Sequence, residues 1–194
     1  MLSNLDNYNI ILTSQSPRRQ ELLKGLNIPF EVQVIDVEET YPNQFVGVDI
    51  PMYLAEKKAD AFIDKMDDKT LLITADTIVW HEGQVFGKPI DKADATRMLT
   101  ELSGKTHQVI TGVCISTLKR RKTFHVTSEV RFTRLTPDEI EYYLQNYQPY
   151  DKAGAYGVQE WIGYVGVEHI EGSYFNVMGL PIQRLYSELK RWKK

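Results

Sequence analysis

The sequence contains a single cysteine, Cys114, among its 194 residues. One thiol excludes an internal disulfide, so no disulfide framework supports the fold, and the chain suits a reducing compartment. Cys114 lies in an apolar, strand-like run, which favours a core-filling role over a nucleophilic one. The four histidines show no metal-ligand spacing, so a zinc site is not expected.

Long apolar runs are also missing, since no stretch approaches the roughly 20 apolar residues that cross a bilayer. Residues 1–9 are polar and lack the basic and apolar regions of a signal peptide. The net charge of −3 argues against broad nucleic-acid binding, although it leaves room for local basic pockets. We therefore expect a cytoplasmic protein that binds neither a membrane nor a nucleic acid.

The remaining composition is that of an ordinary globular protein, with 42% hydrophobic and 25% charged residues. A chain of this length can form one domain of two lobes with a substantial core. No internal repeat, low-complexity segment or linker interrupts it. We expect a single domain over residues 1–194.

The stretch from residue 9 to residue 25 predicts a strand, a tight loop and a helix. Residues 10–12 are apolar, and Pro17 occupies the first helical position, which proline favours. Ser16 is then the expected N-cap, with its hydroxyl available to the free amides of the first turn. Gly25 is expected to end the helix in a left-handed conformation.

Arg18 and Arg19 fall in the first turn of that helix, where the helix dipole favours acidic residues instead. Two arginines beside a helix N-terminus, among the hydroxyls of Ser14 and Ser16, form a suitable receptor for a polyanion, and phosphate is the obvious one. The alternative is a pair of solvated surface arginines.

Residues 71–80 form the most apolar stretch of the chain and predict a central strand. Asp76 interrupts it. A carboxylate in a buried strand is costly unless it is paired or bound to metal, so Asp76 is a candidate functional residue. The alternative is an acid that backbone donors satisfy. Residues 84–86 are expected to return as a hairpin.

The other segments alternate between strand and helix patterns, which indicates an α/β fold. The expected strands cover residues 29–37, 107–118 and 123–135, and the expected helices cover residues 52–65, 91–102, 136–147 and 181–192. Glu38 and Glu39 follow the first of these strands. Ligands of α/β proteins bind at strand ends, so the two acids are candidates for a site, and solvated acids are the alternative. Lys57 and Lys58 are neighbours on the expected 52–65 helix, and the pattern alone cannot favour either of them as a functional residue.

Residues 83–89 resemble a phosphate-binding P-loop only superficially. Three residues, not four, separate the glycines, and Pro89 stands where serine or threonine would bind magnesium. We reject a P-loop, while Lys88 can still serve a phosphate as a point charge.

Residues 152–159 break all periodicity, and their glycines allow the backbone to approach a ligand closely. Tyr156 and Gln159 can stack on a nucleotide base or bond to it. A plain structural loop is the alternative.

Four groups of segments together resemble the Maf family of nucleoside triphosphate pyrophosphatases. They are residues 14–19 (SQSPRR), 75–79 (ADTIV) with 87–89 (GKP), 102–109 (LSGKTHQV) with 111–112 (TG), and 151–159 (DKAGAYGVQ) with 179–181 (GLP). They occur in family order and span nearly the whole chain. The resemblance implies an α/β fold like that of inosine triphosphate pyrophosphatases, with a mixed sheet, flanking helices and a cleft between two lobes.

The resemblance also implies hydrolysis of a nucleoside triphosphate to the monophosphate and pyrophosphate, with magnesium or manganese as cofactor. Asp76 falls on the general-base position, Glu39 on the acidic position near it, and both are implied metal ligands. Lys58 and Lys88 fall on the two catalytic lysines. The positions implied for substrate binding are Ser14, Arg18, Arg19, Thr77 and Gln159.

The 152–159 segment is similar to the family branch that prefers dTTP and UTP, rather than the 7-methyl-GTP branch. Glu160 departs from that branch, which usually has glycine there. The resemblance further suggests a homodimer. Two other functions stay open: a nucleotide-binding regulator of cell division without turnover, and a pyrophosphatase for modified purine nucleotides.

Overall fold

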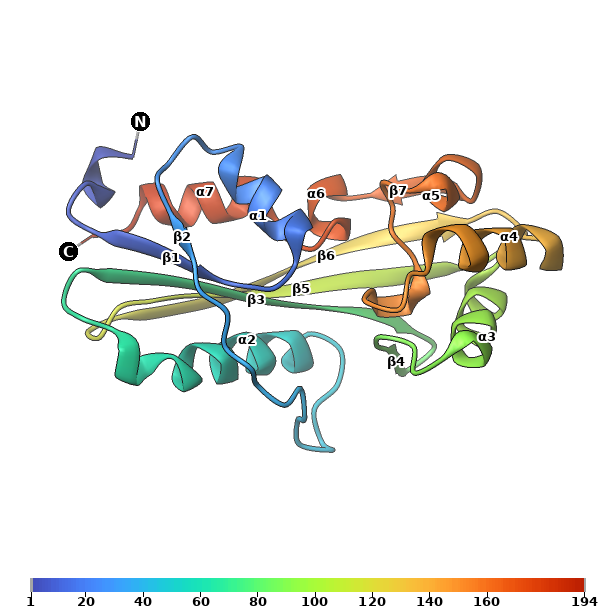
Figure 1. Cartoon of the computed structure of the whole chain (residues 1–194), viewed down its shortest axis with the longest axis horizontal. Coiled ribbons are helices and arrows are strands. Elements are labelled where there is room, and N and C mark those ends of the chain that lie inside the picture. The colour runs from blue at the N-terminus through green and yellow to red at the C-terminus, as the bar shows by residue number, and fades with distance from the viewer. Residues whose placement is uncertain (1, 194) are drawn as a thin grey trace. The chain divides into compact units, whose positions relative to one another are not determined.

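The computed structural model describes residues 2–193, and its elements are labelled in Figure 1. The strands are β1 (Asn9–Thr13), β2 (Glu31–Val32), β3 (Thr70–His81), β4 (Gln84–Phe86), β5 (Thr106–Ser116), β6 (Arg121–Phe132) and β7 (Val167–Glu171). The α-helices are α1 (Pro17–Lys24), α2 (Asp49–Ala61), α3 (Lys92–Leu102), α4 (Pro137–Tyr147), α5 (Trp161–Val165), α6 (Tyr174–Val177) and α7 (Ile182–Lys190). Short 3-10 helices are η1 (Ser3–Leu5), η2 (Ile63–Lys65) and η3 (Ala153–Ala155).

The strands form one mixed sheet in the order β2-β1-β3-β5-β6-β7, with β4 paired to β3. β1 runs parallel to both β2 and β3, whereas β4 and β7 are antiparallel to their partners. The predicted α/β class with a mixed sheet and flanking helices is confirmed. None of the helices among residues 2–193 has the length and apolar character needed to cross a membrane.

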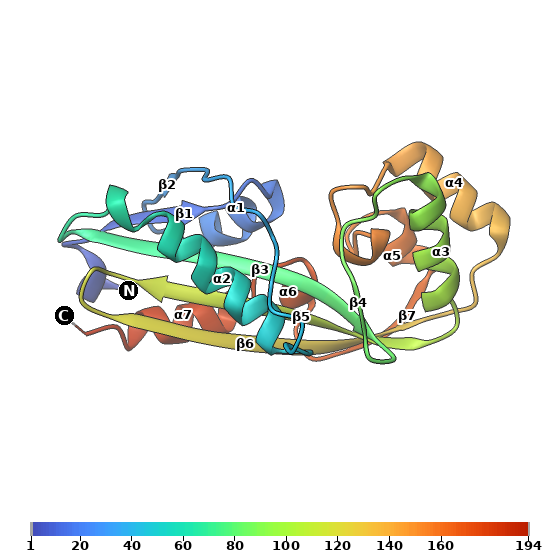
Figure 2. The same ribbon diagram turned by 90° about the horizontal axis from the view of Figure 1, so that it is seen from below.

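The chain forms two compact units. Of the described residues, the first comprises 2–76, 111–126 and 179–193, and the second comprises 77–110 and 127–178. In the first unit, α2 lies on one face of the strands, and α1 and α7 lie on the other (Figures 1 and 2). Cys114 is fully buried there, against apolar residues of β1, α2 and β3, so its predicted core role is confirmed.

The second unit has its own core. Apolar side chains of α3 and α4 pack there against β-strand residues and against the 153–162 segment. α4 begins with the predicted capping box, in which the Thr136 hydroxyl accepts from the Glu139 amide and the Glu139 carboxylate accepts from the Thr136 amide. The Asp91 carboxylate accepts a hydrogen bond from the Asp94 amide at the start of α3, as expected for an N-cap.

Three local predictions were wrong. Only Glu31–Val32 of the predicted 29–37 strand is a strand paired with β1, and the last bond to β1 is from the Gln33 amide to the Leu12 carbonyl, because the segment lies at the edge of the sheet and β1 itself ends at Thr13. Ser16 is the N-cap of α1, but its side chain makes no capping hydrogen bond. Gly25 keeps a right-handed conformation, and Asn27 takes the left-handed one instead, which asparagine tolerates better than most residues.

Candidate active site

The register between β1 and β3 determines which residues meet at the end of these strands. Thr13, the last residue of β1, pairs with Thr74 of β3, so the chain leaves β1 beside Ala75 and Asp76. The carboxyl ends of parallel strands are where α/β proteins bind ligands. The predicted Ser14–Arg19 segment and the predicted Asp76 are therefore brought to the same end of the first unit.

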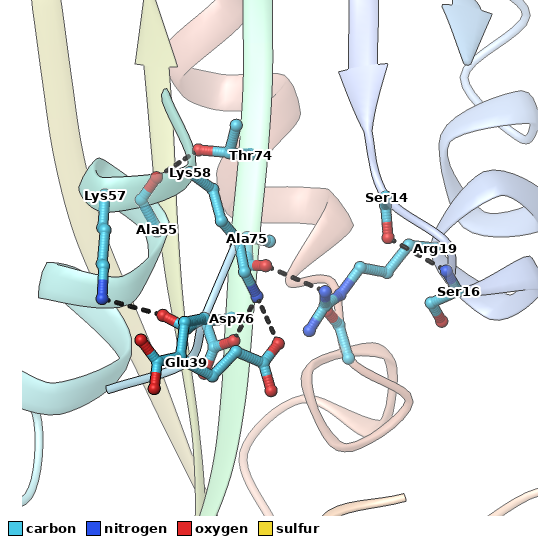
Figure 3. Close-up of polar contacts among 12 residues, drawn as sticks. Ser14, Ser16, Arg19, Glu39, Ala55, Lys57, Lys58, Thr74, Ala75 and Asp76 are labelled. Carbon is cyan, nitrogen blue, oxygen red and sulfur yellow. Dashed lines mark hydrogen bonds and ion pairs between the residues drawn. The ribbon is translucent and has the colours of Figure 1, made fainter. Parts of the chain in front are cut away.

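Arg19 connects α1 to two other parts of this unit. Its Nε donates to the carbonyl of Gly179 at 2.7 Å. Its Nη1 donates to the carbonyl of Ala75 at 2.9 Å (Figure 3). Burial lowers the pKa of the Arg19 guanidinium, and the nearby Asp76 carboxylate opposes this effect. Arg19 thus places a positive charge beside Asp76 through a fixed geometry.

Ser14 and Arg18 lie in the same segment. The buried Ser14 Oγ accepts from the Ser16 amide at 3.2 Å, and the Ser14 carbonyl accepts from Gln20 Nε2 at 3.2 Å. Both bonds hold the loop between β1 and α1 in shape. Arg18 is half-buried next to Arg19, and its charge contributes to the lowered pKa of Arg19.

Lys58 joins the two predicted acids. Its Nζ lies 2.5 Å from Asp76 Oδ1 and 2.9 Å from Glu39 Oε1 (Figure 3). Asp76 is 6% exposed, and the Lys58 side chain is 13% exposed. Burial of the Asp76 carboxylate would be costly without a charged partner, and Lys58 is that partner.

The packing of α2 against the sheet explains why Lys58 reaches Asp76. Thr74 Oγ1 donates to the carbonyl of Ala55 at 2.6 Å, which ties α2 to β3 one helical turn before Lys58. A Cβ on Gly112 of β5 would lie 2.3 Å from the Pro51 carbonyl oxygen, so only glycine admits the helix this close. Gly112, the second residue of the 111–112 motif, therefore allows α2 to pack closely against β5.

The structure also distinguishes the two adjacent lysines of α2. Lys57 Nζ donates to the carbonyls of Glu38 and Thr40 at 2.8 and 3.0 Å and to Thr40 Oγ1 at 2.9 Å. Lys57 therefore holds the backbone that carries Glu39, while Lys58 contacts the carboxylates. Nothing in the sequence pattern indicated this role for Lys57, because its partners are main-chain atoms.

Burial raises the pKa of the Asp76 carboxyl above its ordinary value, and the positive charges of Lys58 and Arg19 oppose the rise. A carboxylate with a raised pKa is a stronger general base than one at its ordinary pKa. The arrangement is therefore suited to accepting a proton from water in a site that also holds two cations.

Glu39 and Asp76 also meet the donor requirements of a divalent metal bound together with a substrate. Their carboxylates converge on one point, now held by Lys58 Nζ. Magnesium is commonly bound by one or two carboxylates plus substrate phosphates and water, rather than by an all-protein cage. Among residues 2–193, no cluster of three or more histidine, cysteine, aspartate or glutamate side chains suited to a metal occurs.

The other three predicted residues belong to the second unit. Thr77 follows Asp76 directly on β3 and is half-buried, and Lys88 is exposed in the loop after β4. The Gly154 amide donates to the Gly87 carbonyl at 3.0 Å, so the Lys88 loop adjoins the glycine-containing 152–159 segment. Gln159 is half-buried, and its Oε1 is buried without a hydrogen-bond partner among the described residues.

Comparison with known proteins finds a family model, full-length relatives and a solved structure that are similar to this chain. A family model described as Maf-like protein matches residues 9–192. The dTTP/UTP pyrophosphatase of Bacteroides fragilis (strain YCH46) is 58% identical over 192 residues, which cover 98% of this chain and 100% of that protein. The dTTP/UTP pyrophosphatase of Flavobacterium johnsoniae is 48% identical over 95% of each chain. The structure of the Staphylococcus aureus Ham1 protein aligns with 64% of this chain and 71% of that one, at 16% identity and a TM-score of 0.48.

Proposed function

We propose, because the chain belongs to the Maf family, that it hydrolyses nucleoside triphosphates to the monophosphate and pyrophosphate, with dTTP and UTP as preferred substrates. The observation that carries the proposal is the contact of Lys58 with both Asp76 and Glu39, beside Arg19. The names of the full-length relatives support the choice of substrates. The match over residues 9–192 supports a single Maf-like domain over residues 1–194.

In the proposed reaction, a water oxygen attacks the α-phosphorus and the bond from that phosphorus to the β-phosphate oxygen breaks, so that pyrophosphate leaves. Asp76 accepts the proton of the attacking water, for which its raised pKa suits it. Lys58, Arg18, Arg19 and Lys88 stabilise the negative charge of the phosphates, and Ser14 and Thr77 bind the substrate. A divalent magnesium or manganese ion, held by Glu39 and Asp76 together with the phosphates, would supply further positive charge and a more acidic water.

The test is an assay of wild-type protein with a panel of nucleoside triphosphates in magnesium or manganese, in which pyrophosphate and orthophosphate are quantified separately. Pyrophosphate and the monophosphate are expected in equal amounts. Orthophosphate with accumulating diphosphate would contradict the proposal. Tight nucleotide binding without turnover would instead support the regulator of cell division, and a preference for modified purines would support the third function.

Gln159 is proposed to read the base. Uracil and thymine present a ring N–H between two carbonyls, and a glutamine side chain offers one acceptor and one donor to match them. Gln159 Oε1 is buried and has no hydrogen-bond partner among the described residues, so the side chain has to turn toward the base before this oxygen can accept from that N–H. Cytosine lacks the N–H, and a mismatched polar group costs about 1–3 kcal/mol.

Gln159→Ala is therefore expected to lower the UTP/CTP ratio of kcat/KM by about tenfold, while turnover of the best substrate falls less. The measurement is kcat/KM for UTP, dTTP and CTP in the wild type and the variant. Gln183→Ala, which removes an exposed glutamine of α7, is the control and should leave the ratio as it is. An unchanged ratio in Gln159→Ala would show that another residue reads the base.

The proposal includes a cytoplasmic homodimer, as the family resemblance suggests. Sedimentation velocity at micromolar concentration is expected to show a species of twice the 22.4 kDa chain mass. A monomer across that concentration range would contradict the dimer without affecting the proposed reaction.

A further inference from the structure

The residue proposed to read the base lies in a tight turn of the second unit. The Glu160 amide donates to the Gly157 carbonyl at 3.0 Å, which closes a four-residue turn with Gln159 in its third position. The direction of the Gln159 side chain therefore depends on how firmly both ends of this turn are held.

One hydroxyl holds both ends. Tyr143 of α4 accepts a hydrogen bond from the Gly157 amide at 2.9 Å and donates its own proton to Glu160 Oε2. Tyr143 is fully buried, and burial together with the Glu160 carboxylate raises the pKa of its hydroxyl. The hydroxyl consequently remains protonated and serves as the donor to Glu160.

Lys152 completes the arrangement from the other side of Glu160. Its Nζ lies 3.1 Å from Glu160 Oε1 and 2.7 Å from Asp151 Oδ1, and its side chain is only 9% exposed. A nearly buried lysine between two carboxylates is strongly paired, because an unpaired charge at such a site would be costly. Each oxygen of the Glu160 carboxylate thus has its own donor.

The backbone around the turn leaves little room for another conformation. A Cβ on Gly157 would lie 2.8 Å from the Glu160 carboxyl carbon, and a Cβ on Gly163 would lie 1.7 Å from the Val158 carbonyl oxygen. The turn therefore lies in close contact with the Glu160 side chain at Gly157 and with α5 at Val158. A shift of the Glu160 carboxylate would be transmitted directly to residues 157–159.

We propose that Tyr143, Lys152 and Glu160 are positioning residues for Gln159, and that they set the base selectivity of the enzyme without touching the substrate. The inference rests on the proposed function and adds to it the means by which the selective residue is oriented. It also gives a role to Glu160, the last residue of the turn, whose carboxylate contacts both Tyr143 and Lys152.

Tyr143→Phe tests the proposal because it removes one oxygen and keeps the ring, which stacks on Tyr147 at a centroid distance of 5.2 Å. The expected result is a fall in the UTP/CTP ratio of kcat/KM by up to about tenfold, with a larger change in KM than in kcat for UTP. Tyr147→Phe removes the hydroxyl of the stacked neighbour and should leave the ratio unchanged.

Glu160→Gln keeps an acceptor for Tyr143 but loses the charge facing Lys152. Its UTP/CTP ratio of kcat/KM should therefore lie between those of the wild type and Glu160→Ala.

A double-mutant cycle separates positioning from general destabilisation. In a Gln159→Ala background, Tyr143→Phe should no longer change the UTP/CTP ratio, because the side chain that it orients is gone. A loss of activity that is equal for UTP and CTP in both backgrounds would show a merely structural role and overturn the proposal.

Hydrogen exchange provides a readout that does not depend on activity. Tyr143→Phe should speed exchange of the Gly157 and Glu160 amides, while peptides from α2 and β1 exchange as in the wild type. Unchanged exchange at residues 157–160 would show that Tyr143 and Glu160 do not hold this turn, and would overturn the proposal. Wild-type protein that releases no pyrophosphate would refute the proposed function itself, whereas a selective wild type with an unchanged ratio in Tyr143→Phe would refute only the positioning role.

Discussion

Asp76→Asn is expected to lower kcat/KM for dTTP and UTP by about a thousandfold, because it removes a general base, which typically contributes 10²–10⁴-fold. The substitution keeps the size of the side chain and removes its charge. Lys58 retains Glu39 at 2.9 Å, so the variant does not leave a buried cation without a partner. The assay is pyrophosphate release over a range of substrate concentrations.

The same variant should not lose stability at neutral pH. Because burial raises the pKa of Asp76 in the folded protein, the folded state binds this proton more tightly than the unfolded state does. Ionising Asp76 therefore costs stability as the pH rises from its ordinary pKa to its folded pKa, and that cost persists at higher pH. Asparagine carries no such cost, so Tm measured by circular dichroism at pH 7–8 should be equal to the wild-type value or higher.

Asp68→Asn provides a matched control, since Asp68 is an exposed acid whose ion pair with Lys119 is 3.6 Å long. This variant should retain wild-type activity and Tm. If Asp76→Asn keeps most of the wild-type activity, Asp76 is neither the base nor a metal ligand.

Lys58→Met is expected to lower kcat by about a hundredfold, because it removes a cation aimed at developing negative charge. It should also change the pH dependence in a defined direction. Lys58 is the main charge that opposes the rise of the Asp76 pKa, so its removal should raise that pKa further. The acidic limb of kcat/KM against pH, which reports the free enzyme's base, should consequently move to higher pH.

Lys92→Met serves as the control, because it removes an exposed lysine whose 2.5 Å contact is with Glu141 on the surface. Neither kcat nor the acidic limb should change in this variant. An acidic limb that stays in place in Lys58→Met would show that Asp76 is not the group titrating in kcat/KM, even if the rate falls.

Several elements could be predicted because their signals are local. The apolar run that became β3, the Asp91 cap of α3 and the capping box of α4 each depend on residues within a few positions of one another. Asp76 stood out for the same kind of reason, since a single acid in a buried strand needs a partner wherever the strand lies. The sequence by itself thus determined the mixed α/β elements and the central acid.

The partners of that acid were decided by tertiary packing. Lys57 and Lys58 are chemically identical neighbours, and only the contacts of α2 with Thr74 and Gly112 direct Lys58 to Asp76 and Lys57 to the main chain. The 29–37 strand shortened to two residues because a sheet edge offers hydrogen bonds on one side only.

The contacts among Tyr143, Lys152 and Glu160 that hold the turn of Gln159 could likewise not be predicted from the sequence pattern. Tyr143 faces the core of the second unit at the spacing of an ordinary apolar helix residue, and nothing in the sequence pattern connected it with Glu160, or Glu160 with Lys152. Their hydrogen bonds exist because α4 packs against residues that lie 14 to 17 positions after Tyr143 in the chain, and burial then makes each polar group require a partner. Periodicity identifies which residues are buried, but only the packed structure decides which buried polar groups meet.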